Sequence, residues 1–129
     1  MRTRVAEAQV GRLATTTAEN EPHIVPCCFA LGGDVVYSAV DHKPKSTRAL
    51  QRLMNLRANP HAALLVDEYH DDWSALWWVR ADGLARILYD GTDFEHAITL
   101  LVAKYRQYRD DPPLGPVIAL DVATWRSWP

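Results

Sequence analysis

The order of strand-like and helix-like segments is the feature that most constrains how this chain can fold. Apolar and β-branched segments typical of strands lie at residues 12–17, 23–31, 35–40, 61–67, 73–89 and 117–122. Residues 1–10, 47–58 and 92–105 instead place apolar side chains at helical spacing. One predicted helix therefore lies between the third and fourth strands, and another precedes the last strand. This order favours a mainly β fold with peripheral helices, a small antiparallel barrel formed by one domain over residues 1–129.

Several local signals refine this prediction. Pro26 removes a backbone donor from the second strand, which indicates an edge, a bulge or a place where another group meets the backbone. Residues 61–67 are almost wholly apolar, which predicts a strand buried on both faces. We expect the segment 73–89 to bend near Asp82 and Gly83. Thr92 and Glu95 have the spacing of a capping box at the start of the last long helix.

Composition excludes several classes of protein. The formal charge of −2 argues against a general nucleic-acid-binding protein. We expect no membrane association, because no apolar segment approaches the length of about 20 residues that crosses a bilayer. The two cysteines, Cys27 and Cys28, are adjacent and are poorly placed for a disulfide, which favours a cytoplasmic protein. We interpret both as small buried hydrophobic residues rather than redox thiols.

A basic stretch interrupts this acidic chain. No acidic residue occurs between Asp41 and Asp67, and five cations lie in that interval: Lys43, Lys45, Arg48, Arg52 and Arg57. The stretch leads into a predicted helix, whose amino terminus attracts anions. Arg48 and Arg52 stand four residues apart and therefore share one helix face. The pattern predicts a site for a phosphate or several carboxylates, and the alternative is a solvated polar face opposite Leu53.

Aromatic residues gather further along the chain. Trp73, Trp77 and Trp78 lie within six residues of one another, with Tyr69 nearby. Aromatic side chains are suitable walls for a planar heterocycle, although a core or a dimer interface would use them equally well. On a strand, Trp77 and Trp78 point to opposite faces and cannot share a role. Together with the basic stretch, they predict a site for a phosphorylated cofactor.

Three segments, in order, resemble one known family. They are GRLATTTAENEPHIVPCCFAL (11–31), VVYSAVDHKPKSTRALQRLMNLRANPHAALLVD (35–67) and DDWSALWWVRADGLARI (71–87). The chain resembles the pyridoxamine-phosphate-oxidase-like split β-barrels, and within them the small oxidoreductases that use the deazaflavin coenzyme F420. The resemblance implies a homodimer with two cofactor sites at the subunit interface.

The resemblance also implies which residues hold the cofactor. The basic link and helix start would bind its phosphate and acidic tail through Lys43, Lys45, Ser46, Thr47 and Arg48. The preceding strand ends would lie along its rings through Val25, Pro26, Cys27, Ser38, Ala39 and Val40. Trp73 would reach the site from the second subunit. We add Arg52 from the helix geometry.

The implied activity is hydride transfer between coenzyme F420 and a small organic, conjugated substrate. The alternatives are an FMN-dependent oxidoreductase of the same fold and a flavin- or deazaflavin-binding protein without turnover. No catalytic residue is assigned, and Tyr69 and His70 are candidate proton donors because they precede Trp73 in the chain. The five histidines show no metal-ligand spacing, so we expect no metal site.

Overall fold

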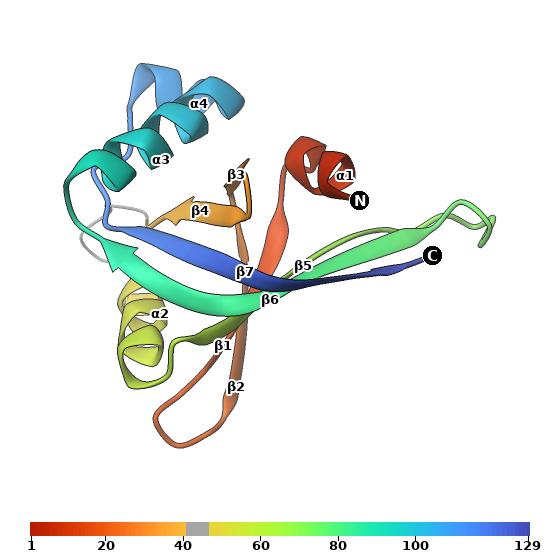
Figure 1. The fold of residues 1–129 in the computed structure, drawn as a ribbon, viewed down its shortest axis with the longest axis horizontal. Helices are drawn as coiled ribbons and strands as arrows, with labels where there is room; N and C mark the ends of the chain where they lie inside the picture. Colours follow the sequence, from red (N-terminus) through yellow and green to blue (C-terminus); the bar gives the residue numbers. More distant parts are fainter. Residues whose placement is uncertain (41–46) are drawn as a thin grey trace.

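The computed structural model describes the backbone of residues 1–40 and 47–129, and the side chains of residues 1–40 and 51–129. The described chain forms a single curled sheet with helices around it (Figure 1). Its elements are α1 (Arg2–Glu7), β1 (Gly11–Thr16), β2 (Pro22–Cys27), β3 (Ala30–Gly32), β4 (Val35–Ala39), α2 (Thr47–Ala58), β5 (His61–Glu68), β6 (Trp77–Leu88), α3 (Thr92–Lys104), α4 (Arg106–Asp110) and β7 (Val117–Trp128).

The sheet curls because its two edge strands are consecutive in the chain. The strand order is β2-β1-β5-β6-β7-β4-β3, and every neighbouring pair is antiparallel. Only Cys28 and Phe29 separate β2 from β3, so the opposite edges of the sheet must approach each other. The predicted mainly β split barrel is thereby confirmed. Pro26 lies on β2, which pairs with β1 alone among the described strands, as expected of an edge strand.

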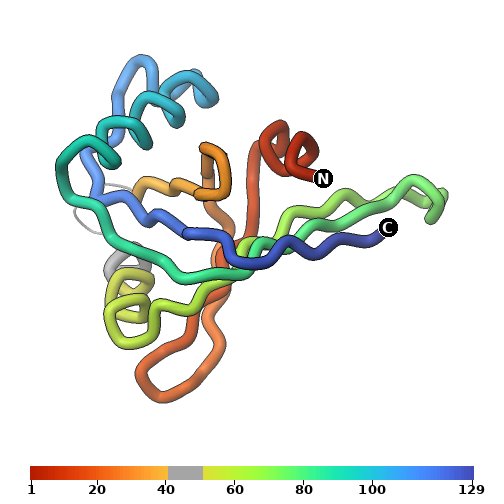
Figure 2. Tube along the Cα trace, in the orientation of Figure 1, coloured from red at the N-terminus to blue at the C-terminus, as the bar shows by residue number. Residues whose placement is uncertain are grey.

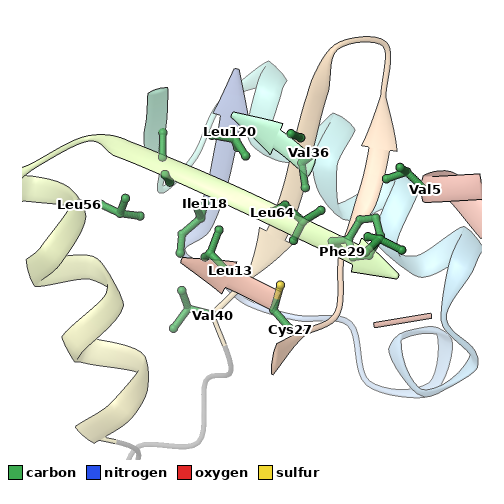
Figure 3. Close-up of a cluster of buried hydrophobic side chains, with 14 of the residues drawn as sticks. Val5, Leu13, Cys27, Phe29, Val36, Val40, Leu56, Leu64, Ile118 and Leu120 are labelled. Atoms are coloured by element: carbon green, nitrogen blue, oxygen red, sulfur yellow. The ribbon is translucent and has the colours of Figure 1, made fainter. Parts of the chain in front are cut away.

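The inner face of the curled sheet carries the main core. Leu13 faces Leu64 across β1 and β5, and Leu64 faces Ala81 across β5 and β6. All three side chains are buried. Leu56 of α2 reaches the same cluster beside Val40, so α2 packs against the inner side of the barrel (Figure 3). Burial of these apolar side chains against one another is the main force that holds the barrel closed.

A second core forms where α3 packs on the outer side of β4 and β7. Ala97 and Leu101 of α3 are fully buried against Tyr37 and Val117. Thr92 is the first residue of α3, and its side chain does not cap the helix, because the N-cap is Gly91. The predicted capping box is therefore wrong, although the helix begins where the pattern indicates.

Strand β6 bends where the sequence indicates. The β6–β7 register shifts between Asp82 and Gly83, which marks an irregularity in the ladder. A Cβ atom at Gly83 would lie 2.0 Å from the Asp121 carbonyl oxygen, so glycine is required at this crossing. The prediction for β5 is wrong in part. Its residues alternate between buried and partly exposed, and Ala63 and Leu65 on the outer face are only half-buried.

Strands β5 and β6 extend together as a long hairpin away from β1, β2, β3 and β4 (Figure 1). We call the outer end of this hairpin, residues 67–78, the hairpin arm. The last residues of β7 run alongside it, with Trp128 opposite Trp78 (Figure 2). The arm and α2 lie at opposite ends of the molecule. Among the described residues, no helix has the length and apolarity needed to cross a bilayer.

Candidate functional site

The ends of β2 and β4 meet at the turn that follows β2. The Ser38 hydroxyl donates a hydrogen bond of 2.8 Å to the Cys28 carbonyl oxygen, which ties the two strand ends together. Ser38 and Cys27 are both buried. Because β2 pairs on one side only within the described sheet, its other edge leaves backbone groups available to a planar heterocycle. We call this region, Val25–Cys28 with Ser38–Val40, the strand-end site.

Arg52 of α2 acts on the strand-end site through its charge. Burial raises the pKa of the Cys27 thiol, and a hydrogen bond with Ser38 and the charge of Arg52 both act in the opposite direction. The charge of Arg52 therefore acts on Cys27, and the Ser38 hydroxyl lies at the same strand end. A flat anionic molecule can use two features there, the cation and the open strand edge, while the Ser38 hydroxyl holds the strand ends together.

The other residues predicted to bind the phosphate and the acidic tail have no described side chains. Lys43, Lys45 and Ser46 are outside the described residues. Thr47 and Arg48 begin α2, but their side chains are also outside them. Their assignment to a phosphate and an acidic tail stays a prediction.

The residues predicted to lie along the cofactor rings differ in exposure. Pro26 is exposed and Val25 half-buried, whereas Cys27, Ser38, Ala39 and Val40 are buried. The Cys27 and Val40 side chains belong to the main core. These buried residues can contact a cofactor chiefly through their backbone, which leaves Pro26 and Cys28 as the surface of the site.

The two cysteines have different environments. Cys27 is buried, as predicted for a small hydrophobic residue, and Cys28 is exposed. The prediction is wrong for Cys28 because β2 ends at Cys27, and the chain then turns towards β3. Both thiols are free.

Lys104 and Tyr105, at the end of α3, hold the turn between β2 and β3. The Phe29 amide donates to the Tyr105 hydroxyl at 2.9 Å, and the Lys104 ammonium donates to the Phe29 carbonyl at 2.8 Å. The Tyr105 hydroxyl also donates to the Gln9 or the Phe29 carbonyl oxygen, at 2.9 and 3.0 Å. Sequence reasoning placed Tyr105 in the core but missed this clamp, since no local signal links residues 76 positions apart.

A buried polar chain fixes α2 on β1. The Gln51 amide donates to the Asn55 side-chain oxygen at 2.7 Å, and the Asn55 amide donates to the Thr15 hydroxyl at 3.0 Å. Asn55 is 1% exposed and Thr15 is 4% exposed. The Asn55–Thr15 bond is buried, so its loss would leave an unsatisfied polar group, whereas the Gln51–Asn55 bond is only partly buried. This chain therefore holds the helix that carries Arg52 in one position.

The structure separates the remaining candidates from the strand-end site of the same chain. Tyr69, His70 and Trp73 lie on the hairpin arm, at the other end of the sheet from α2. Tyr69 and Trp73 are each 69% exposed, and the Trp73 indole donates to the Tyr69 hydroxyl at 3.4 Å. His70 Nε2 lies 3.4 Å from a Glu68 carboxylate oxygen. Any contact between Trp73 and a strand-end site must involve a second molecule.

Metal ligands do not cluster in the part of the chain that the structure describes. No group of three or more histidine, cysteine, aspartate or glutamate residues there could hold an ion. An ordinary metal site needs three or four such ligands around one point.

Solved structures share this fold. A heme binding protein from Mycobacterium smegmatis superposes with a TM-score of 0.79 at 23% identity, over 98% of this chain and 51% of that one. A conserved hypothetical protein from Mycobacterium tuberculosis superposes with a TM-score of 0.78 at 19% identity, over 98% of this chain and 80% of that chain. A FAD-binding protein from Mesorhizobium loti superposes with a TM-score of 0.72 at 19% identity, over 98% of this chain and 89% of that chain. At these identities the likeness concerns the fold.

Sequence comparison assigns the family. No curated protein matches the chain. The family described as pyridoxamine 5'-phosphate oxidase matches residues 1–129. The match spans the strand-end site, the basic stretch and the hairpin arm together. The chain therefore belongs to the pyridoxamine 5'-phosphate oxidase family.

Proposed function

We propose that this protein is an oxidoreductase that binds coenzyme F420 at the strand-end site. The observation that carries the proposal is that the open edge of β2 is tied to the end of β4, which leads directly into the basic stretch, and that the charge of Arg52 acts on Cys27 at this strand end. A phosphodiester with a carboxylate tail needs a line of cations, and the chain supplies four of them between residues 43 and 52: Lys43, Lys45, Arg48 and Arg52. FMN, with one phosphate, needs fewer.

The cofactor would supply the redox chemistry. The protein would set the distance between cofactor and substrate and the face from which hydride is transferred. A bound deazaflavin supplies hydride transfer to or from a small organic, conjugated substrate, with the accompanying proton exchanged with solvent or a side chain. Tyr69 and His70 stay candidates for that proton, because both lie on the exposed hairpin arm. The chain's own residues would orient the ring system along β2 and hold its charged tail at α2.

We also propose that the protein acts as a homodimer with its cofactor sites at the interface. The support is the exposure of Trp73 on an arm that lies far from the strand-end site of its own chain. The outer sheet face also keeps Ala63 and Leu65 half-exposed, which a second copy could cover. Analytical ultracentrifugation should find a dimer, and a concentration-independent monomer would contradict this arrangement.

FMN is the second candidate cofactor. It is favoured by the family and by the similarity to a FAD-binding protein from Mesorhizobium loti. A cofactor-binding protein without turnover would have the same fold and binding residues, since function depends on the site and not on the fold.

Two equilibrium titrations test these proposals, one with oxidised F420 and one with FMN, followed by cofactor fluorescence. We expect tight, salt-sensitive binding of F420. Arg52→Gln should weaken it about tenfold, on the order expected for one charge-assisted contact, and Arg57→Gln is the matched control in the last turn of the same helix. Lys45→Ala should weaken binding likewise. Preference for FMN would move the chemistry to the alternative, and binding of neither would refute the oxidoreductase proposal.

A further inference from the structure

The structure contains a hollow on the outer face of the hairpin arm, away from the strand-end site. Its volume is about 360 Å³, which suits a molecule of one or two fused rings. Its apolar walls come from β5, the connection to β6, and β6 itself. These walls are formed by Leu65, Tyr69, Leu76, Trp77 and Trp78. Trp77 also packs on the main core, and the prediction that Trp77 and Trp78 cannot share a role is wrong because both line this hollow. Two or more aromatic faces around one small hollow favour a flat occupant that can stack on them.

Each ionised side chain that lines the hollow already has a partner. Asp67 accepts a hydrogen bond of 2.8 Å from Arg12. Arg80 makes a two-point contact with Asp82, at 2.8 and 3.0 Å.

Glu68 is the third such group. It accepts from the Trp77 indole at 2.9 Å and lies 3.4 Å from His70. An incoming charged ligand would therefore have to break an existing pair or enter without a counter-ion. Either requirement costs binding free energy that a neutral ligand does not lose.

One polar group stays available to a ligand. The Tyr69 hydroxyl accepts from the Trp73 indole at 3.4 Å, which leaves its own proton free to be donated. A carbonyl oxygen on the rim of a flat ligand could accept that proton. Trp73 itself is exposed beside this hydroxyl group and can extend the aromatic wall.

We propose that this hollow is a binding site for an uncharged, flat aromatic molecule that carries a hydrogen-bond acceptor. Its role as the substrate site rests on the proposed function, whereas binding itself does not. In the homodimer proposed above, the arm of one subunit would bring this hollow towards the strand-end site of the other. The substrate in the hollow of one subunit would then lie beside the cofactor at the strand-end site of the other subunit.

The test uses a pair of isosteric probes with the cofactor-free protein. 2-Naphthamide is neutral and 2-naphthoate is an anion of the same shape, and equilibrium dialysis measures both. We expect 2-naphthamide to bind and 2-naphthoate to bind at least about tenfold more weakly, because Asp67 and Glu68 disfavour a further negative charge. Equal or tighter binding of the anion would overturn the proposal, as would a failure of 2-naphthamide to bind.

Variants locate the site. Trp78→Ala removes a wall and should weaken 2-naphthamide binding about tenfold. Trp125→Ala removes an indole from the opposite side of the sheet, where it packs against the main core, and should leave binding unchanged. Tyr69→Phe should weaken binding a few-fold while leaving the fold intact. Equal effects of Trp78→Ala and Trp125→Ala would place the ligand elsewhere.

F420 titration of the same samples keeps this proposal separate from the proposed function. Cofactor binding without 2-naphthamide binding would remove the hollow as a site and leave the oxidoreductase proposal standing. Binding of 2-naphthamide without binding of F420 would support the hollow as a site and refute F420 as the cofactor.

Discussion

Removal of one hydroxyl group, in Tyr105→Phe, tests how the turn between β2 and β3 is held. Phe29 is 0% exposed, so its backbone amide cannot reach water. Its partner is the Tyr105 hydroxyl at 2.9 Å. The Phe29 carbonyl keeps its bond from Lys104, and Gln9 is exposed, so its carbonyl can turn to water. The variant therefore leaves one buried donor unsatisfied.

An unsatisfied buried donor costs about 1–3 kcal/mol, so we expect the free energy of unfolding to fall by about 2 kcal/mol. This is a large fraction of the total, which for such domains is about 5–15 kcal/mol. Burial raises the pKa of Tyr105 above its ordinary value of 10.0. The hydroxyl is therefore protonated in both the folded and the unfolded chain below pH 10, and its contribution is fully present there. It is lost only as the pH rises through the folded-state value.

Urea unfolding at pH 7 measures this loss. With a slope of about 2 kcal/mol/M, the midpoint should fall by about 1 M. Tyr69→Phe is the matched control, because that hydroxyl is on an exposed side chain, and it should change the free energy of unfolding by less than about 0.5 kcal/mol. Equal losses of unfolding free energy in the two variants would refute the clamp. Core packing alone would then hold the turn between β2 and β3.

Three further predictions concern single sites. Burial lowers the pKa of Lys104 to about 8, from the ordinary 10.5, so the unfolded chain binds more protons between these values. The free energy of unfolding of the wild type should therefore rise relative to Lys104→Met from pH 8 to pH 10, as urea titrations at each pH will show. Gly83→Ala should cost about 3 kcal/mol in thermal melts, because the new Cβ would collide with the Asp121 carbonyl. Trp77→Ala should destabilise the fold by about 2–3 kcal/mol, since Trp77 packs on the core, whereas Trp78→Ala should affect mainly ligand binding, as calorimetry and dialysis will separate.

The sequence was sufficient for most of the succession of strands and helices along the chain, because apolar alternation and turn residues are local signals. The bend at Gly83, the edge position of Pro26 and the buried side of α3 all follow from such signals. The break between β2 and β3 was not predicted, because no turn residue in 23–31 indicates it. The polar groups of Phe29 are satisfied by Lys104 and Tyr105, some 75 residues later, and only the folded barrel brings them together.

The candidate site shows the same division. The basic stretch is visible in the sequence because charge clustering needs no fold to be recognised. The place of Ser38 at the end of β2 depends on sheet register, which the resemblance supplied and composition could not, whereas Arg52 was predicted from helix spacing. The buried bond between Asn55 and Thr15, which fixes α2, is indicated neither by the sequence pattern nor by the family resemblance.

The incorrect prediction for β5 bears on function. Its apolar residues predicted burial on both faces, yet the outer face, with Ala63 and Leu65, is only half-buried within one chain. A strand with apolar residues on a half-exposed face indicates that something else covers that face. The half-buried side chains of Leu65 and Trp78 also line the hollow of about 360 Å³ on the hairpin arm. The excess of apolar residues in β5 is thus accounted for if a second subunit covers one part of this face and a flat ligand the other.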